Sequence, residues 1–182
     1  SGFWYAAGGI GQLMGAMAAQ IGLLGGELVL GARVRTIEVV DGAIAGVEVD
    51  GPEGPARFAS RRVIAGLPPA LVAGLVDPPP PADLIPPLAP RAAALVYLSV
   101  ATPRVTEHAW IQLDHPDVPF ARLSEVANWS ERLVPDGRTV LGCEVYCHPH
   151  PDDRWWALSD AALADACARA LCGPLNLVDD PS

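Results

Sequence analysis

The sequence contains no lysine, and all 12 of its basic residues are arginines, set against 21 acidic residues. The net charge is −9 and the isoelectric point is near 4.7. This balance argues against binding to nucleic acid or to anionic membranes, because both need a basic surface. A GC-rich coding bias explains the arginine usage more simply than selection for bidentate binding does.

The chain also lacks a recognisable signal peptide and a long uninterrupted apolar run. Residues 1–5 contain no basic region before an apolar stretch. Residues 10–31 are apolar, but two glutamines, Glu27 and several glycines interrupt them, which is not typical of a membrane span. These absences predict a cytoplasmic protein without an integral membrane segment.

Cysteine is scarce, and no pair of the four has the spacing of a disulfide framework. Cys143 and Cys147 fall on one predicted strand, roughly 13 Å apart at ~3.3 Å per residue, too far to share a zinc ion. Cys147, His148 and His150 could bind a metal only if the chain turned sharply between them. Buried cysteine and surface histidine are the favoured interpretation, and we expect no metal.

The motifs of hydrolases and of simple phosphate loops are missing as well. No serine lies in a G-x-S-x-G turn, and no nucleophile, base and acid group together, which argues against hydrolysis. Gly9-Ile10-Gly11 lacks the third glycine of a G-x-G-x-x-G loop, because Met14 stands there. The helix that follows would still present free backbone amides to a nearby phosphate or carboxylate.

The first half of the chain predicts a helix followed by an antiparallel meander. Apolar residues recur at helical spacing from Ile10 to Leu24, and the other face is small, so we expect a helix buried on both sides. Gly25-Gly26 would end it. Asp41-Gly42 predicts a hairpin. We expect strands at residues 27–40, 43–49 and 56–60.

A buried strand is then expected at Val63 to Leu67, closed by Pro68-Pro69 and followed by a helical turn at 70–76. Residues 77–90 are rich in proline, which is incompatible with a helix interior or a central strand. A stiff, extended linker is the simplest account. We therefore divide the chain into residues 1–76, a linker at 77–90, and residues 91–182.

The second half predicts a mixed or antiparallel sheet with a covering helix. Strands are expected at residues 93–101, 109–114, 120–127 and 139–146, separated by turn residues. A helix should begin at Ser159-Asp160 and end at Gly173-Pro174. Taken together, the elements predict an α+β fold with α/β character.

Polar and aromatic residues gather in this second sheet. Side chains alternate along a strand, so Arg122 and Glu125 should lie on opposite faces. Trp110 and Asn128 lie in the neighbouring segments. An arginine on a strand is usually solvated or paired, but an arginine on an aromatic-rich face can also line a pocket for an acidic or planar ligand. Both interpretations stay open.

A succession of short motifs runs through the whole chain. The first half contains Gly8-Gly9, a small-residue helix, Gly25-Gly26, Val34-Arg-Thr-Ile37, the Asp-Gly hairpin, Val63-Ile64 and Pro68-Pro69. The second half contains Trp110-Ile-Gln, Phe120-Ala-Arg-Leu-Ser-Glu125, Asn128-Trp-Ser130 and Glu144. This order and spacing resemble the flavin-dependent amine oxidase superfamily, which includes protoporphyrinogen oxidases, phytoene desaturases and amine oxidases. The second half is most similar to its protoporphyrinogen-oxidase-like and sugar-mutase-like members.

The resemblance implies a partial FAD-binding domain at residues 1–76 and part of a substrate-binding domain at 91–182. The backbone at Val34 would pair with the adenine end of FAD, Ala65-Gly66 would run beneath the cofactor, and Gly8-Gly9 would lie near the domain junction. The family's opening dinucleotide motif and its closing Gly-Asp segment are absent. The chain thus resembles the middle of such an enzyme.

For Arg122, Trp110 and Asn128 we expect a role in binding substrate, whereas no catalytic residue can be assigned. The implied function is FAD-dependent oxidation of a small organic molecule by hydride transfer. Porphyrinogen, carotenoid, amine and sugar nucleotide all remain open as substrates. The chain alone should bind FAD weakly or not at all. The alternative is a non-catalytic binding module that keeps the fold without the cofactor.

Overall fold

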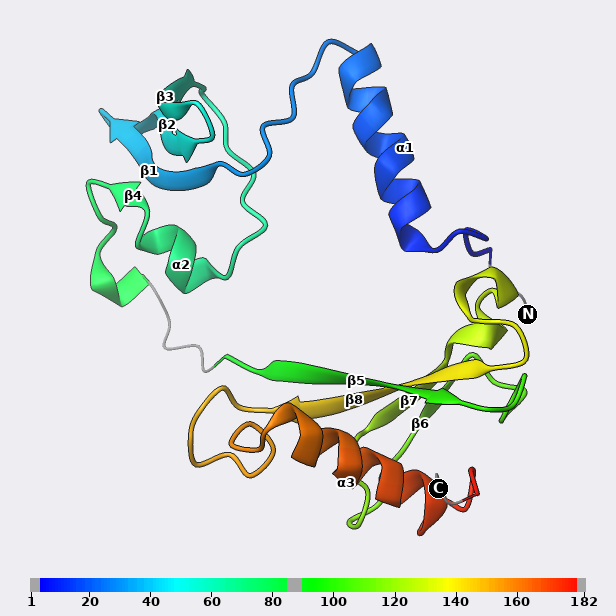
Figure 1. Ribbon diagram of the computed structural model, residues 1–182. Helices are drawn as coiled ribbons and strands as arrows, with labels where there is room; N and C mark the ends of the chain where they lie inside the picture. Colours follow the sequence, from blue (N-terminus) through cyan, green and yellow to red (C-terminus); the bar gives the residue numbers. More distant parts are fainter. Residues whose placement is uncertain (1–3, 85–89, 180–182) are drawn as a thin grey trace. The chain divides into compact units, whose positions relative to one another are not determined.

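A computed structural model describes residues 4–84 and 90–179 (Figure 1). The fold is α+β, with one mixed sheet, one antiparallel sheet and few helices. The chain divides into two compact units, residues 18–89 and residues 1–17 with 90–182, which are described separately. The functional ranges 1–76 and 91–182 stay predictions. No helix in the described ranges has the length and apolar content needed to cross a bilayer.

Helix α1 (Ile10–Leu23) has the predicted extent but not the predicted burial. Gly25 follows it with a φ of 79°, which suits a helix end. None of its residues is buried, and nothing lies within 4 Å of the Cβ position of Gly11 or Gly15. Leu13 is 48% exposed and Met17 is 53% exposed. The expectation of burial on both sides is wrong here, because no described element packs on the helix.

The first sheet is the predicted meander plus one further strand. It consists of β1 (Arg33–Val40), β2 (Ala43–Gly51), β3 (Gly54–Ala59) and β4 (Val76–Asp77), in the order β3-β2-β1-β4. The predicted hairpin is confirmed: Asp41 has a φ of 51° and Gly42 a φ of 74°, as a tight β1–β2 turn requires. β1 begins at Arg33 and not at Glu27. Arg33 already pairs with Asp50, near the end of β2, so β2 offers no partners to the residues before it.

Residues 63–67 do not form the predicted buried strand. They lie in an irregular segment in which Ile64 is fully exposed, at 100%. The place beside β1 is taken by β4, which pairs with it in parallel through Ile37 and Val76. The short helix α2 (Pro69–Ala73) precedes β4.

The predicted linker at 77–90 is only partly described. Its first residue, Asp77, belongs to β4, and a 3₁₀ turn, η1, spans Ala82–Leu84. Residues 85–89 lie outside the described part of the chain.

A charged pair ties the outer strands of the meander together. Arg57 of β3 donates hydrogen bonds from Nε to both carboxylate oxygens of Glu38 on β1, each at 2.9 Å. This contact lowers the pKa of Glu38. The pair passes over Gly46 of β2, where an added Cβ would lie 2.9 Å from Phe58 O and 3.1 Å from Arg57 Nη2. Glycine at 46 therefore allows the pair to form.

We expect Gly46→Ala to destabilise the meander by about 1–3 kcal/mol, as overpacking commonly does. The new methyl group would press on the β3 backbone and on the Arg57 guanidinium. Faster amide hydrogen exchange in β2 would report the loss. Gly66→Ala is the control, because no atom lies within 4 Å of that Cβ position. Equal protection in the two variants would contradict the prediction.

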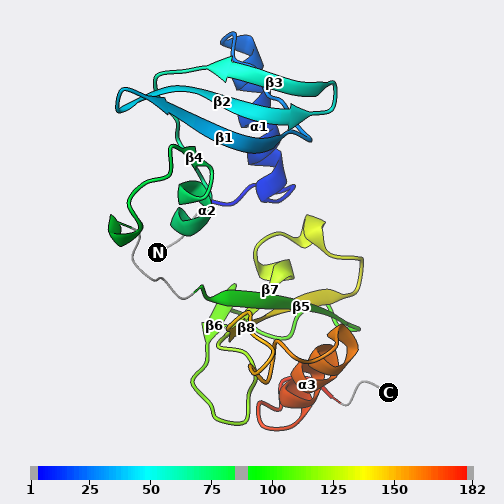
Figure 2. The same cartoon turned by 90° about the vertical axis from the view of Figure 1, so that its left-hand side faces the viewer.

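The second sheet is antiparallel throughout and has the predicted strands. It consists of β5 (Ala92–Val100), β6 (Trp110–Gln112), β7 (Arg122–Glu125) and β8 (Thr139–Cys147), in the order β5-β8-β7-β6. Helix α3 (Asp160–Cys172) lies on one side of this sheet (Figure 2). Ser159 caps its start by accepting a hydrogen bond from the amide of Ala162, and Gly173 follows its end, as predicted.

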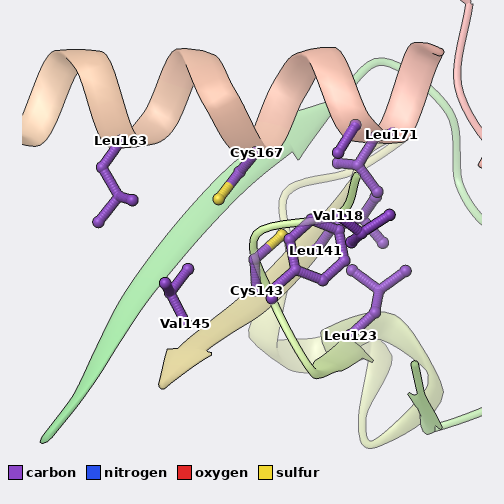
Figure 3. Close-up of a cluster of buried hydrophobic side chains, with 10 residues drawn as sticks. Val118, Leu123, Leu141, Cys143, Val145, Leu163, Cys167 and Leu171 are labelled. Carbon is purple, nitrogen blue, oxygen red and sulfur yellow. The ribbon is translucent and has the colours of Figure 1, made fainter. Parts of the chain in front are cut away.

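An apolar layer between β8 and α3 forms the main core (Figure 3). Leu141, Cys143 and Val145 of β8 have no exposed surface. Side chains of α3 point toward them, including Leu163, Cys167 and Leu171. Burial of this layer fixes which face of the sheet the helix covers.

The buried thiol of Cys143 should react slowly. A hydrogen bond with Cys167 and burial among apolar groups both raise the pKa of Cys143. The native chain should therefore keep Cys143 protonated at pH 8. We expect a thiol reagent to modify it on the order of a hundredfold more slowly than in the unfolded chain. Half-buried Cys172 is the internal comparison and should react first, so early labelling of Cys143 would contradict this.

Candidate functional site

The face of the second sheet opposite α3 is rich in exposed aromatic and charged side chains. We define this open face by six residues: Leu95, Tyr97, Trp110, Arg122, Glu144 and Tyr146. Strand alternation places them there, because the register sets Leu95, Glu144 and Arg122 in one cross-strand row. Tyr97 is 63% exposed and Leu95 56%. Large apolar groups left on a sheet face mark a candidate binding surface.

Arg122 is held in a polar cluster at the centre of the open face. Its Nη1 lies 3.4 Å from Glu144 Oε1, and its Nη2 donates to the hydroxyl of Tyr146 at 2.9 Å. The Tyr146 hydroxyl in turn donates to Glu144 Oε2 at 3.0 Å. Arg122 is thus paired, as one of the two sequence interpretations required, and it still borders an aromatic surface.

Tyr97 lies close over the sheet backbone beside this cluster. It is directly opposite Gly142 of β8, and a Cβ added there would come within 3.1 Å of the tyrosine ring. Ser124 of β7 is the next residue in the same row. A small residue at 142 therefore lets the tyrosine ring approach the sheet.

Among the described residues, three aromatic rings meet at one end of the open face. Trp110 stacks on Trp129 with ring centroids 5.4 Å apart and planes at 26°. Tyr5 meets Trp129 edge-on at 5.1 Å. The Trp129 indole donates from Nε1 to the carbonyl of Ala109 at 2.9 Å, which fixes its position beside β6.

The segment before α1 belongs to the same unit and packs on this end of it. Ser130 Oγ donates to the carbonyl of Ala7 at 2.8 Å. Gly9 is buried with a φ of 83°, and a Cβ on it would lie 3.2 Å from the Leu133 side chain. The structure therefore brings the predicted cofactor residues Gly8 and Gly9 close to the segment that carries Trp129.

Asn128 is the third residue for which a substrate role was expected. Its Nδ2 group donates to the carbonyls of Thr106 and His108 at 2.9 Å each, and it lies 3.2 Å from Glu125 Oε2. The amide nitrogen is thus used within the fold. Contact of Asn128 with substrate stays a prediction.

Sequence reasoning missed the role of Glu125. Its carboxylate is only 2% exposed and accepts four hydrogen bonds. The alternation of residues 122–125 correctly put it on the face opposite Arg122. One signal in the sequence could have revealed this role: alternation places a charged residue on the buried face of the strand.

The remaining predicted cofactor residues lie in the other unit. Val34 is half-buried on β1 and pairs with Val49, while Ala65 and Gly66 are exposed in the irregular segment. Their contacts with FAD stay predictions. In the part of the chain that the structure describes, no group of three histidine, cysteine or acidic residues could hold a metal ion.

The succession of a mixed sheet and a helix-covered antiparallel sheet is shared with larger enzymes. An oxidoreductase from Methanosarcina mazei matches with a TM-score of 0.67 and 22% identity, over 79% of this chain and 35% of that one. Reduced UDP-galactopyranose mutase matches with a TM-score of 0.70 and 17% identity, over 94% of this chain and 36% of that one.

At these identities the likeness shows the fold alone, and the chain spans little more than a third of either protein. No protein-family model and no curated protein matches the sequence.

Proposed function

We propose that the chain is part of an FAD-dependent oxidoreductase that takes hydride from a small organic substrate. The observation that carries this proposal is the fold shared, over 79% and 94% of the chain, with an oxidoreductase and a reduced mutase. The motif order, which resembles flavin-dependent amine oxidases, supports it separately. FAD, when bound, would supply the hydride acceptor, and the protein would supply position and electrostatics.

The described residues suit only part of such a cofactor. The proposal assigns Val34 to the adenine end and Ala65-Gly66 to the strip beneath the flavin. Gly66 has open space around it, with no atom within 4 Å of its Cβ position, so a flat group can approach its backbone. A glycine-rich cradle for the diphosphate is missing from residues 4–84 and 90–179.

Residues 18–84 also have too small a core for a complete domain. Ile37 and Val49 are their buried apolar side chains, whereas Leu23, Ile64 and Leu71 are exposed. Such exposed groups are expected where further elements pack. We infer that the rest of an FAD-binding domain covers them.

Titration with FAD tests this division of the cofactor site. The 182-residue chain should bind FAD weakly or not at all, because the diphosphate has little to hold it. A chain extended to the full reading frame should bind FAD and show a flavin absorption spectrum. Tight stoichiometric binding by the short chain would overturn the assignment, and a colourless extended protein would count against the oxidoreductase itself.

We assign the open face to substrate binding. It combines an apolar, aromatic surface with one guanidinium group, the mixture typical of small-molecule sites. Arg122 would hydrogen-bond the substrate from within the Glu144–Tyr146 cluster, and Trp110 and Asn128 would border it. Gly8-Gly9 would lie near the junction with the FAD-binding domain.

Arg122→Ala in the extended protein should raise KM roughly tenfold, equivalent to about 1.4 kcal/mol of binding. The variant loses both the guanidinium and the support it gives Tyr146. The assay would use whichever of a porphyrinogen, a polyene, an amine or a sugar nucleotide supports turnover. Arg104→Ala is the matched control, since Arg104 pairs with exposed Glu131 and lines a pocket with residues of α3, on the other side of the sheet. An unchanged KM for Arg122→Ala would remove the assignment.

A non-catalytic module that keeps the fold is the second candidate. The absence of a diphosphate cradle from the described residues favours it. The spectrum of the extended protein separates the two functions, because only the oxidoreductase requires bound flavin.

A further inference from the structure

Glu125 is a buried carboxylate without a basic partner among its hydrogen-bonding neighbours. Oε1 accepts from the amide of Val105 at 2.7 Å and from Thr139 Oγ1 at 2.9 Å. Oε2 accepts from the amide of Thr106 at 2.7 Å and from Asn128 Nδ2 at 3.2 Å. All four partners are neutral donors, so the carboxylate is satisfied only while each donor stays in place.

A contribution to stability does not explain why a carboxylate is buried at position 125. Removing a carboxylate from water is costly, and well-packed apolar residues usually stabilise a core as well or better. Leu123, two residues earlier on the same face of β7, is an apolar residue that is also 2% exposed. What distinguishes Glu125 is therefore the set of groups that donate hydrogen bonds to its carboxylate oxygens.

The carboxylate holds the irregular segment that leads into β6. Two consecutive amides of that segment, at Val105 and Thr106, point at it. Asn128 fastens the same segment from the other side through the carbonyls of Thr106 and His108. Glu125 also donates its own backbone amide to Ala109 at 3.1 Å. The segment is thus fixed up to the residue before Trp110.

These ties continue to the aromatic pair on the open face. Ala109, whose carbonyl accepts from the Glu125 amide, also accepts from the Trp129 indole. Trp129 directly follows Asn128 and stacks on Trp110. The chain of hydrogen bonds therefore runs from the buried face of β7 to the two indole rings on the other side of the sheet.

We propose that Glu125 is a positioning residue that sets the Trp110–Trp129 pair through its carboxylate contacts with Val105, Thr106 and Asn128. The value of this pair for substrate binding rests on the proposed function, but the positioning itself does not. Substrate selectivity at that end of the open face would then depend on a residue that never contacts substrate.

Glu125→Gln in the 182-residue chain tests the proposal. Glutamine has the same shape but turns one acceptor oxygen into a donor, which faces a backbone amide in either orientation. Whichever of the Val105 and Thr106 amides faces the new NH2 group should exchange hydrogen on the order of tenfold to a hundredfold faster, the expected effect of leaving a buried donor unsatisfied. The circular-dichroism signal of the indole pair, defined as the part lost in Trp110→Phe, should fall by more than half while the far-ultraviolet backbone signal is retained.

Two controls separate positioning from general destabilisation. Thr139→Val removes one side-chain donor but keeps both backbone contacts, so the indole signal should survive. Glu131→Gln removes a carboxylate that is 83% exposed and pairs with Arg104, and it should leave the indole signal unchanged. If Glu125→Gln does not fold, Asn128→Ala replaces it. That variant keeps three donors on the carboxylate, and it should lose part of the indole signal.

The indole signal is the deciding measurement. A full indole signal with protected Val105 and Thr106 amides in Glu125→Gln would overturn the proposal, as would a full signal in Asn128→Ala. Neither measurement uses FAD or substrate. A failure of the proposed function would instead appear as an extended protein without flavin, so the two failures are distinguishable.

Discussion

The apolar layer between β8 and α3 determines how the residues of the second unit are arranged. Strand side chains alternate, so sealing Leu141, Cys143 and Val145 against the helix forces the residues between them onto the opposite face. Those residues are Gly142 and Glu144, which accommodate Tyr97 and hold Arg122. The packing of β8 against α3 thus determines both the core and the candidate substrate surface. A one-residue shift in the register of β8 would exchange the side chains of its two faces.

The two units differ in how far their own residues account for their stability. The second sheet and α3 enclose a continuous core of buried side chains. The meander has two buried apolar residues and relies mainly on its strand pairing, because the solvent-accessible Arg57–Glu38 pair contributes little. The second unit thus has a core of its own, whereas the meander leaves much of its apolar surface uncovered.

Local signals in the sequence predicted local structure well. Asp41-Gly42 gave the hairpin and Ser159 with Gly173 gave the ends of α3, because turn and capping chemistry acts over a few residues. Predictions that depended on partners were weaker: the helix at 10–24 was right in extent and wrong in burial, and Val63 to Leu67 is no strand. Two of the four hydrogen bonds that the Glu125 carboxylate accepts come from backbone amides about twenty positions away, so no local pattern could have revealed them. Alternation placed Arg122 and Glu125 on opposite faces of their strand, but it could not identify the partners of either residue.

Gly142 beneath Tyr97 has an evolutionary consequence. With a methyl group at 142 the tyrosine ring would have to move by a few tenths of an ångström, and with a larger side chain it would have to leave the sheet. Substitutions at these two positions are therefore not independent: a descendant can enlarge residue 142 freely only after residue 97 has become smaller. Residues 97 and 142 together set the shape of this part of the open face. A change of that shape to suit a new ligand would have to begin with a substitution at residue 97.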